Sequence, residues 1–182
     1  MKSILLIGNS GGIGHALQGA LEARGAKVTG LSRRDTGLDL SDEASIEGQL
    51  STLSGPFDAI LVASGALEIN GARPEKALSQ LTQSAFLDQF IVNAAGPALI
   101  LKHAPRLLPK DRPSQFAALS ARVGSIGDNK IGGWYSYRAA KAALNQIIHT
   151  GAIELARTHK QAICVEALEI VKFFNKSVHT TG

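Results

Sequence analysis

The 182-residue chain has few of the residues that mark several classes of protein. It has one cysteine, Cys164, which excludes an internal disulfide and fits the reducing cytoplasm where we expect the protein to act. Aromatic residues make up only 5% of the chain, and apart from Arg33-Arg34 the basic residues are scattered. A nucleic-acid surface needs a basic stripe with stacking rings. The formal net charge of +4 therefore does not predict a nucleic-acid partner.

Long apolar runs and metal-ligand clusters are also missing from the sequence. No apolar run approaches the roughly 18 residues that a membrane-spanning helix needs. The run at Ser3–Ile7 breaks into glycines instead of reaching a cleavage site, which favours a buried strand over a signal peptide. The five histidines are widely separated, and none stands at zinc-site spacing with Cys164 or a carboxylate. We therefore expect neither a membrane partner nor a metal site.

What the sequence does contain is a regular alternation of short apolar runs and helical patterns. Apolar residues make up 45% of the chain, and its length suits one domain with a sizeable core. The strands are expected at Ser3–Ile7, Lys27–Leu31, 58–62, 115–119 and 162–168. Because helices alternate with these strands and no repeat is present, we predict an α/β fold with a doubly wound parallel sheet.

The first strand leads into a glycine-rich turn, Gly8-Asn9-Ser10-Gly11-Gly12-Ile13-Gly14, and then into a helical pattern closed by Gly25. A strand, a glycine turn and a helix in this order place backbone N–H groups and a helix N-terminus around a phosphate. Glycine motifs alone are weak, and a plain tight turn is the alternative. In this context the sequence favours pyrophosphate binding by the turn.

The second strand ends in Ser32-Arg33-Arg34-Asp35. In a dinucleotide fold an acidic residue at this point accepts hydrogen bonds from a free ribose 2′-hydroxyl, whereas arginine accommodates a 2′-phosphate. Guanidinium groups pair well with phosphate, so we expect NADP(H) in preference to NAD(H). Asp35 leaves the alternative open, as does a plain solvated turn.

Two further segments are candidates for ligand contacts. Ala63-Ser64-Gly65-Ala66 ends the strand at 58–62 with small residues that let a ligand approach the backbone. In the long helical pattern at 82–108, Pro97 lacks an N–H and crowds the carbonyl of Asn93 four residues earlier. The pattern therefore predicts a free Asn93 carbonyl, with a kink for packing as the alternative.

Tyr137 and Lys141 form the candidate proton-transfer pair. A spacing of four residues stacks both side chains on one helix face. An ammonium close to a phenol lowers the pKa of that phenol, and an acid tuned toward neutrality can exchange a proton with a carbonyl/alcohol couple. The spacing is common by chance, so the interpretation depends on the other motifs in the chain.

Together these motifs resemble the short-chain dehydrogenase/reductase family, in its C-factor and sniffer-like carbonyl reductase branch. The similarity covers residues 4–168 and includes the glycine turn, Asp58 to Gly65, Asn93 and the pair Tyr137/Lys141. Ile7 stands where threonine is usual. The resemblance implies a Rossmann-type sheet with strand order 3-2-1-4-5-6, helices on both faces and a missing seventh strand. It implies a cofactor site whose members are Gly8, Asn9, Ser10, Gly11, Gly12, Ile13, Gly14, Ser32, Arg33, Arg34, Asp39, Leu40, Ala63, Ser64, Gly65, Tyr137 and Lys141.

The resemblance also implies the catalytic roles. Tyr137 would be the general acid in carbonyl reduction, and Lys141 would bond the nicotinamide ribose and lower the pKa of the phenol. The Asn93 carbonyl would hold a water that joins Lys141 to solvent. A serine would hold the substrate oxygen. The family often has two serines at the strand end, but here the pair is Ser120-Ala121, so we expect Ser120, with Ser125 as the alternative.

The end of the chain departs from the family. No Pro-Gly loop follows the last predicted strand, so residues 1–168 are expected to form the NAD(P)-binding domain and 169–182 an atypical tail, like a truncation or an altered reading frame. We therefore expect an NADP(H)-dependent oxidoreductase acting on a small carbonyl or alcohol, with activity impaired by the short end. The alternative is a non-catalytic NADP(H)-binding or signalling protein. A homodimer or homotetramer is implied by resemblance only.

Overall fold

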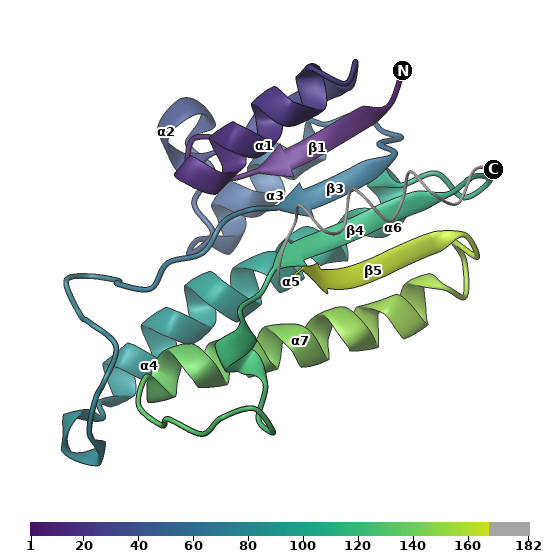
Figure 1. The fold of residues 1–182 in the computed structure, drawn as a ribbon. Coiled ribbons are helices and arrows are strands. Elements are labelled where there is room, and N and C mark those ends of the chain that lie inside the picture. The colour runs from purple at the N-terminus through teal and green to yellow at the C-terminus, as the bar shows by residue number, and fades with distance from the viewer. Residues whose placement is uncertain (168–182) are drawn as a thin grey trace.

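The structure, a computed structural model, describes residues 1–167. Within them, five parallel strands form one sheet in the order β2-β1-β3-β4-β5 (Figure 1). The strands are β1 (Ser3–Ile7), β2 (Lys27–Leu31), β3 (Ala59–Val62), β4 (Ser114–Leu119) and β5 (Ala162–Ala167). Parallel strands need crossover connections, and helical segments supply them here. The doubly wound α/β fold is therefore confirmed.

The helices cover both faces of this sheet. They are α1 (Gly12–Glu22), α2 (Arg33–Thr36), α3 (Glu43–Ser51), α4 (Gln83–Phe90), α5 (Gly96–Lys102), α6 (Ala104–Leu107) and α7 (Tyr135–Leu155). Two 3₁₀ turns, η1 (Leu78–Gln80) and η3 (Arg122–Gly124), and one π-helical turn, η2 (Ile91–Ala95), complete the set. Helix α1 packs on one face, and α3, α5 and α7 pack on the other.

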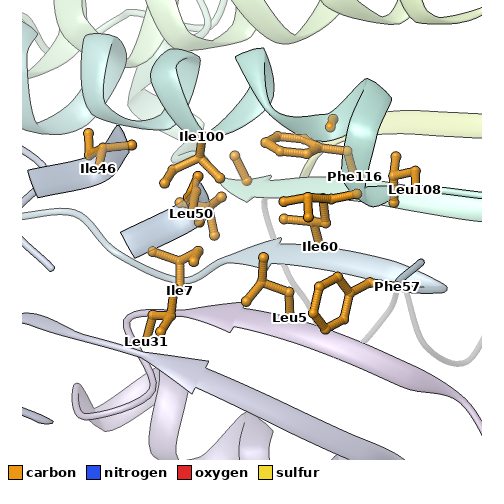
Figure 2. Close-up of a cluster of buried hydrophobic side chains, with 14 of the residues drawn as sticks. Leu5, Ile7, Leu31, Ile46, Leu50, Phe57, Ile60, Ile100, Leu108 and Phe116 are labelled. Carbon is orange, nitrogen blue, oxygen red and sulfur yellow. The ribbon is translucent and has the colours of Figure 1, made fainter. Parts of the chain in front are cut away.

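Alternate residues of each strand feed two separate cores, because successive side chains point to opposite faces of a sheet. Ile4 and Leu6 of β1 pack with α1, whereas Leu5 and Ile7 belong to the larger cluster on the other face. Figure 2 shows this larger cluster, in which the β4 residue Phe116 is fully buried. Burial on both faces is why β1 and β3 read as continuous apolar runs rather than as alternating patterns.

The strand order matches the expected 3-2-1-4-5-6 order except at its first position. Residues 38–41, which would supply the outermost strand beyond β2, run without regular strand structure. Leu38 and Leu40 are nevertheless buried in the larger core. The side chains of this segment therefore pack as those of an edge strand would, although its backbone does not pair with β2 as a strand. The expected tail at 169–182, and with it the absence of a seventh strand, lies outside the described residues.

One helical stretch, Gln83–Lys102, combines α4, η2 and α5 without a break. By length and composition alone it could cross a membrane. It packs along α7 in the structure (Figure 1). It also carries the buried polar side chains of Gln89 and Asn93, which are hydrogen-bonded to each other and to the segment after β3. These contacts are those of a helix packed within the protein fold.

Candidate active site

The glycine turn brings the end of β1 and the start of α1 into direct contact. Gly8 has a φ of 89°, a left-handed conformation that favours glycine, and its N–H donates to Leu31 O at 2.7 Å. A Cβ on Gly14 would lie only 2.0 Å from Gly8 O. Helix α1 begins at Gly12 with no side-chain cap, which leaves its first N–H groups for a ligand. The turn has the geometry that pyrophosphate binding requires.

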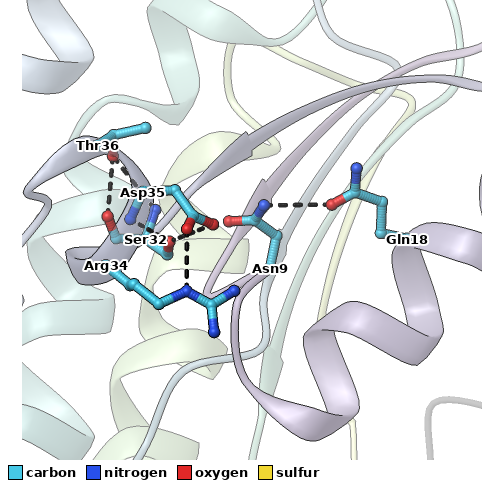
Figure 3. Close-up of polar contacts among 6 residues, drawn as sticks. All are labelled: Asn9, Gln18, Ser32, Arg34, Asp35 and Thr36. Carbon is cyan, nitrogen blue, oxygen red and sulfur yellow. Dashed lines mark hydrogen bonds and ion pairs between the residues drawn. The ribbon is translucent and has the colours of Figure 1, made fainter.

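The side chain of Asn9 packs against the neighbouring elements and supports this turn. Its Nδ2 donates to Gln18 Oε1 at 3.2 Å (Figure 3), and its side chain lies where a Cβ on Gly30 would otherwise stand. The side chain therefore faces β2 and α1. Asn9 shapes the turn through packing, a role that spacing in the sequence did not reveal.

The two arginines after β2 have different surroundings. Arg34 Nε lies 3.0 Å from Asp35 Oδ1, and Ser32 Oγ donates to Asp35 Oδ2 at 3.1 Å (Figure 3). The hydrogen bonds from Arg34 and then Ser32 lower the pKa of Asp35. Arg33 lines the neighbouring cavity and forms no ion pair with the residues that the structure describes. Arg33 is thus the guanidinium that remains for a ligand.

A cavity of about 510 Å³ runs along the carboxyl ends of β1, β2 and β3. Its walls include most of the predicted cofactor residues, namely Gly8, Ser10, Gly11, Ser32, Arg33, Asp39, Leu40, Ala63, Ser64 and Gly65. Asp39 accepts hydrogen bonds from the Ser41 hydroxyl and N–H, which lower the pKa of its carboxyl. The cavity is the feature that such sheets offer to nucleotides.

Other predicted members lie outside the cavity wall. Gly12 and Gly14 belong to α1, Ile13 is 62% exposed, and Asn9 and Arg34 are engaged as described above. Lys141 lies close to Gly65 but outside the cavity wall, and Tyr137 lies next to Lys141 on α7. The prediction missed wall residues from the segment after β3 and from the Gln83–Lys102 helix, namely Ala66, Ile69, Asn70, Asp88, Ile91 and Val92. No motif in the sequence identifies them, because only folding brings that segment over the groove.

Asn93 is fully buried in the π-helical turn η2 and holds the chain just after β3. Its Oδ1 accepts from Ala66 N at 3.1 Å, and its Nδ2 donates to Ala66 O at 2.8 Å and to Gln89 Oε1 at 2.7 Å. The sequence pointed to the main-chain carbonyl of Asn93, above Pro97. The structure adds a side-chain role, a clamp on both polar groups of Ala66.

Lys141 and Tyr137 lie on the same face of α7, with Lys141 Nζ 5.8 Å from the centre of the phenol ring. The amine donates to Leu119 O at 2.9 Å and is 3% exposed, and this burial lowers its pKa to about 8. The expected lowering of the phenol pKa is not found: burial raises the pKa of Tyr137. The physical reason is that desolvation opposes the charged form of either group, and the amine is directed to Leu119 O.

Gly65 joins this pair to the cofactor cavity. A Cβ at this position would lie 2.9 Å from Asn93 Oδ1 and 3.3 Å from Lys141 Nζ. Only glycine lets the strand end, the asparagine and the lysine come this close. Gly65 therefore links the cavity wall to Asn93 and Lys141, and Tyr137 lies next to Lys141 on α7.

The two candidate serines differ in their surroundings. Ser120 follows β4, and its Oγ donates to Asn145 Oδ1 at 2.5 Å, one helical turn beyond Lys141. Ser125 is exposed and accepts from Asp128 N at 3.3 Å within its own loop. Ser120 therefore contacts α7 one turn beyond Lys141, while Ser125 forms a hydrogen bond within its own loop.

Comparison with curated proteins returns dehydrogenases and reductases. The chain is 27% identical over 162 residues to 1-hydroxy-2-glutathionyl-2-methyl-3-butene dehydrogenase of Rhodococcus sp. (strain AD45), covering 81% of this chain and 68% of that protein. It is 28% identical over 160 residues to the 3-oxoacyl-[acyl-carrier-protein] reductase of Escherichia coli (strain K12), covering 79% and 63%. The C-signal of Myxococcus xanthus matches at 30% over 105 residues, covering 56% and 58%. The chain thus spans about two thirds of the length of these relatives.

No family model matches the chain. Among solved structures, a Burkholderia multivorans protein described as a short-chain alcohol dehydrogenase is 30% identical, with a TM-score of 0.76, and the match covers 87% of this chain and 80% of that one. A Burkholderia multivorans short-chain dehydrogenase/reductase with bound NADP is 26% identical, with a TM-score of 0.72 and coverage of 86% and 74%. The glycine turn, the cavity at the carboxyl edge of the sheet and these likenesses together lead to one conclusion: the chain belongs to the short-chain dehydrogenase/reductase family of oxidoreductases.

Proposed function

We propose that the protein is an NADP(H)-dependent carbonyl reductase with Tyr137 as its general acid. The observation that carries the proposal is that Asn93 and Lys141 meet at Gly65, in the wall of the cavity, while Lys141 Nζ lies 5.8 Å from the ring centre of Tyr137. The cavity suits a dinucleotide because it combines an uncapped helix start, close backbone approach at Gly8 and Gly14, and a guanidinium at Arg33. Two structural relatives, one with NADP and one with NADPH, support a nicotinamide cofactor.

The chain's own residues account for the proton half of the reaction. The hydride for the carbonyl carbon would come from a bound nicotinamide. Tyr137 donates its phenol proton to the carbonyl oxygen, and the nearby Lys141 ammonium stabilises the phenolate that remains. Burial raises the pKa of Tyr137 and so makes the phenol a weaker acid, and the nearby Lys141 ammonium is the group that can offset this as the proton leaves. With a pKa of about 8, Lys141 holds an exchangeable proton in the working range.

Ser120 is the proposed anchor for the substrate oxygen. Its hydroxyl is oriented by Asn145 at the same helix that carries Tyr137 and Lys141. Arg33 is the proposed contact for the ribose 2′-phosphate, since Arg34 is held by Asp35. These two assignments are consistent with the proposed small carbonyl or alcohol substrate and with NADP(H) as the cofactor.

The deciding experiment compares Tyr137→Phe with the matched control Tyr135→Phe, two residues earlier on the same helix turn. Wild-type protein should oxidise NADPH with aldehydes, ketones or quinones, and Tyr137→Phe should lower kcat by about 10²- to 10⁴-fold, the usual contribution of general acid catalysis. The control should retain turnover, and the NADPH-induced rise in Tm should be equal in all three proteins. Unchanged turnover in Tyr137→Phe would remove Tyr137 as the acid.

A second candidate function is a non-catalytic NADP(H)-binding or signalling role. The similarity to the C-signal protein favours it, as does Ala121 at the position where the family usually has its second serine. This role predicts that NADPH raises the Tm of the wild-type protein while no carbonyl compound is turned over. Turnover at any rate that Tyr137→Phe abolishes would exclude it.

We also propose a cytoplasmic homodimer or homotetramer. Three exposed apolar side chains on the Gln83–Lys102 helix that do not line the cofactor cavity, Phe86, Leu87 and Phe90, support an interface there. The single cysteine, Cys164, is compatible with a reducing compartment. Light scattering on wild-type protein and on Phe90→Glu should show a larger mass for the wild type.

A further inference from the structure

Residues 66–77 form the segment that follows β3 and Gly65. Hydrogen bonds connect both ends of this segment to residues of the candidate active site. At its start, the Asn93 side chain binds both polar groups of Ala66. At its other end, Glu75 holds the beginning of α7: its main-chain oxygen accepts from Trp134 N, and its Oε2 accepts from Ser136 N at 3.2 Å. The segment therefore connects the Asn93 side of the site to the Tyr137 side.

Glu75 differs from the other charged residues of this segment. Its side chain is 4% exposed, whereas Glu68 and Arg73 form an exposed ion pair with each other. Glu75 Oε1 is buried and has no hydrogen-bond partner within residues 1–167. A buried carboxylate is costly unless hydrogen bonds or favourable charge compensate it. The compensation here comes from the Ser136 N–H and from the positive dipole end of the 21-residue helix α7.

The chain that enters α7 is held in an unusual conformation. Gly132, Gly133 and Trp134 all have a positive φ, of 72°, 66° and 55°. Tryptophan rarely adopts this left-handed region, and such a residue persists only where its surroundings impose it. Glu75 contributes one constraint through Trp134 N. Arg138 contributes another, because its guanidinium donates to Gly133 O at 2.9 Å and to Gly132 O at 3.3 Å. Asn129 Oδ1 also accepts from Gly132 N at 3.0 Å.

The conformation of this turn constrains the position of the Tyr137 side chain. The Trp134 and Tyr137 rings meet edge to face, with centroids 6.3 Å apart and planes at 71°. Tyr137 directly follows Ser136, whose N–H is bound by Glu75. A shift of the first turn of α7 would therefore move the phenol relative to the rest of the site. Lys141, one turn further, is held separately by Leu119 O.

We propose that Glu75 is a positioning residue for Tyr137: its side-chain and main-chain oxygens fix the first turn of α7, and thereby the place of the phenol hydroxyl. The inference rests on the proposed function of Tyr137 as proton donor. Glu75 acts through the hydrogen bond to Ser136 N and does not line the cofactor cavity. Small displacements of a reacting group have large kinetic consequences, so its removal should affect kcat and leave cofactor binding nearly intact.

The test uses three substitutions at Glu75 and a control in the same segment. Glu75→Ala removes the acceptor, Glu75→Asp shortens its reach, and Glu75→Gln keeps an acceptor oxygen of the same reach without the charge. Glu68→Ala is the control, since Glu68 takes part only in an exposed ion pair. We measure kcat, the KM for NADPH, and the emission and acrylamide quenching of Trp134, which is the only tryptophan in the chain.

Glu75→Ala and Glu75→Asp should lower kcat by about 10- to 100-fold with a KM for NADPH within about threefold of wild type. Both should shift Trp134 emission to the red and increase its quenching. Glu75→Gln should restore most of kcat, and Glu68→Ala should match the wild type throughout. Wild-type kcat in Glu75→Asp would overturn the proposal, as would an equal loss of kcat in Glu75→Gln and Glu75→Asp.

The Trp134 fluorescence measurements test this inference even if the proposed function is wrong, because they do not depend on turnover. If the wild-type protein turns over no carbonyl compound, carbonyl reduction is excluded, while Trp134 still reports on the turn. Increased quenching in Glu75→Asp, absent in Glu75→Gln and Glu68→Ala, would then support Glu75 as the residue that holds the turn. Identical quenching in all variants would overturn it. If Glu75→Ala does not fold, Glu75→Asp and Glu75→Gln give the same decision.

Discussion

The two ends of the candidate site are built by different means. At the glycine turn, main-chain groups touch main-chain groups: Gly8 N meets Leu31 O, and Gly14 leaves room for Gly8 O. At the Tyr137 end, side chains reach across the fold to the main chain, as Lys141 does to Leu119 O and Asn93 does to Ala66. At the glycine turn, few residues other than glycine fit. At the Tyr137 end, the structure depends on the particular side chains of Lys141 and Asn93.

This contrast predicts different responses to mutation. Where backbone meets backbone, a single methyl group cannot be accommodated without moving a strand or a helix. Where a side chain reaches across, the loss is limited to that contact and to the groups it leaves unpaired. Substitutions at the two ends test this difference, and the largest effect is expected where backbone meets backbone.

The largest effect is expected for Gly14→Ala. The new Cβ would lie 2.0 Å from Gly8 O, so α1 and the turn must separate, at a cost of about 3 kcal/mol or more in the free energy of unfolding. The matched control is Gly12→Ala, whose Cβ would have no heavy atom within 4 Å and should leave stability near that of the wild type. Urea unfolding of the cofactor-free proteins measures both. Equal stability of the two variants would contradict the interpretation that close backbone contacts at Gly14 hold this end of the site together.

An intermediate effect, dependent on pH, is expected at the buried amine. Burial lowers the pKa of Lys141 from 10.5 to about 8, so between these values the unfolded chain holds a proton that the folded chain has released. The stability of the wild type relative to Lys141→Met should therefore rise as pH increases from about 8 to 10.5, by up to about 3 kcal/mol.

Urea unfolding of both proteins at pH 7.5 and pH 10 measures this change. The exposed Lys110 supplies the control, since Lys110→Met should show no such dependence relative to the wild type. A difference between wild type and Lys141→Met that is constant with pH would show that burial does not disfavour the charged amine.

The smallest effect is expected at the arginine pair, where the cavity is open to solvent. Arg33→Ala should weaken NADPH binding by about tenfold with little effect on NADH, because it removes a charge-assisted contact to the 2′-phosphate. Arg34→Ala should change NADPH binding less, because Asp35 already holds that guanidinium. Titration of the two nucleotides by calorimetry decides this. A larger loss of NADPH affinity in Arg34→Ala would reverse the assignment.

The sequence predicted the backbone-built end better than the side-chain-built end. Glycine spacing after an apolar run indicates the turn because the conformational demands on Gly8 and Gly14 are local. The same reasoning placed Tyr137 and Lys141 on one helix face. It did not predict the raised pKa of Tyr137, since burial depends on packing against distant elements. Nor did it reveal the difference between Arg33 and Arg34.

By itself, the sequence determined the alternation of strands and helices, the glycine turn and the four-residue spacing on α7, because each follows from local backbone preferences and periodicity. Only the tertiary structure decided which side chains meet. The contact between Glu75 and Ser136 joins residues 61 apart in the chain, and that between Asn93 and Ala66 joins residues 27 apart. Such contacts leave no periodic trace in a sequence, since their partners become neighbours only when the parallel sheet brings its carboxyl edge together.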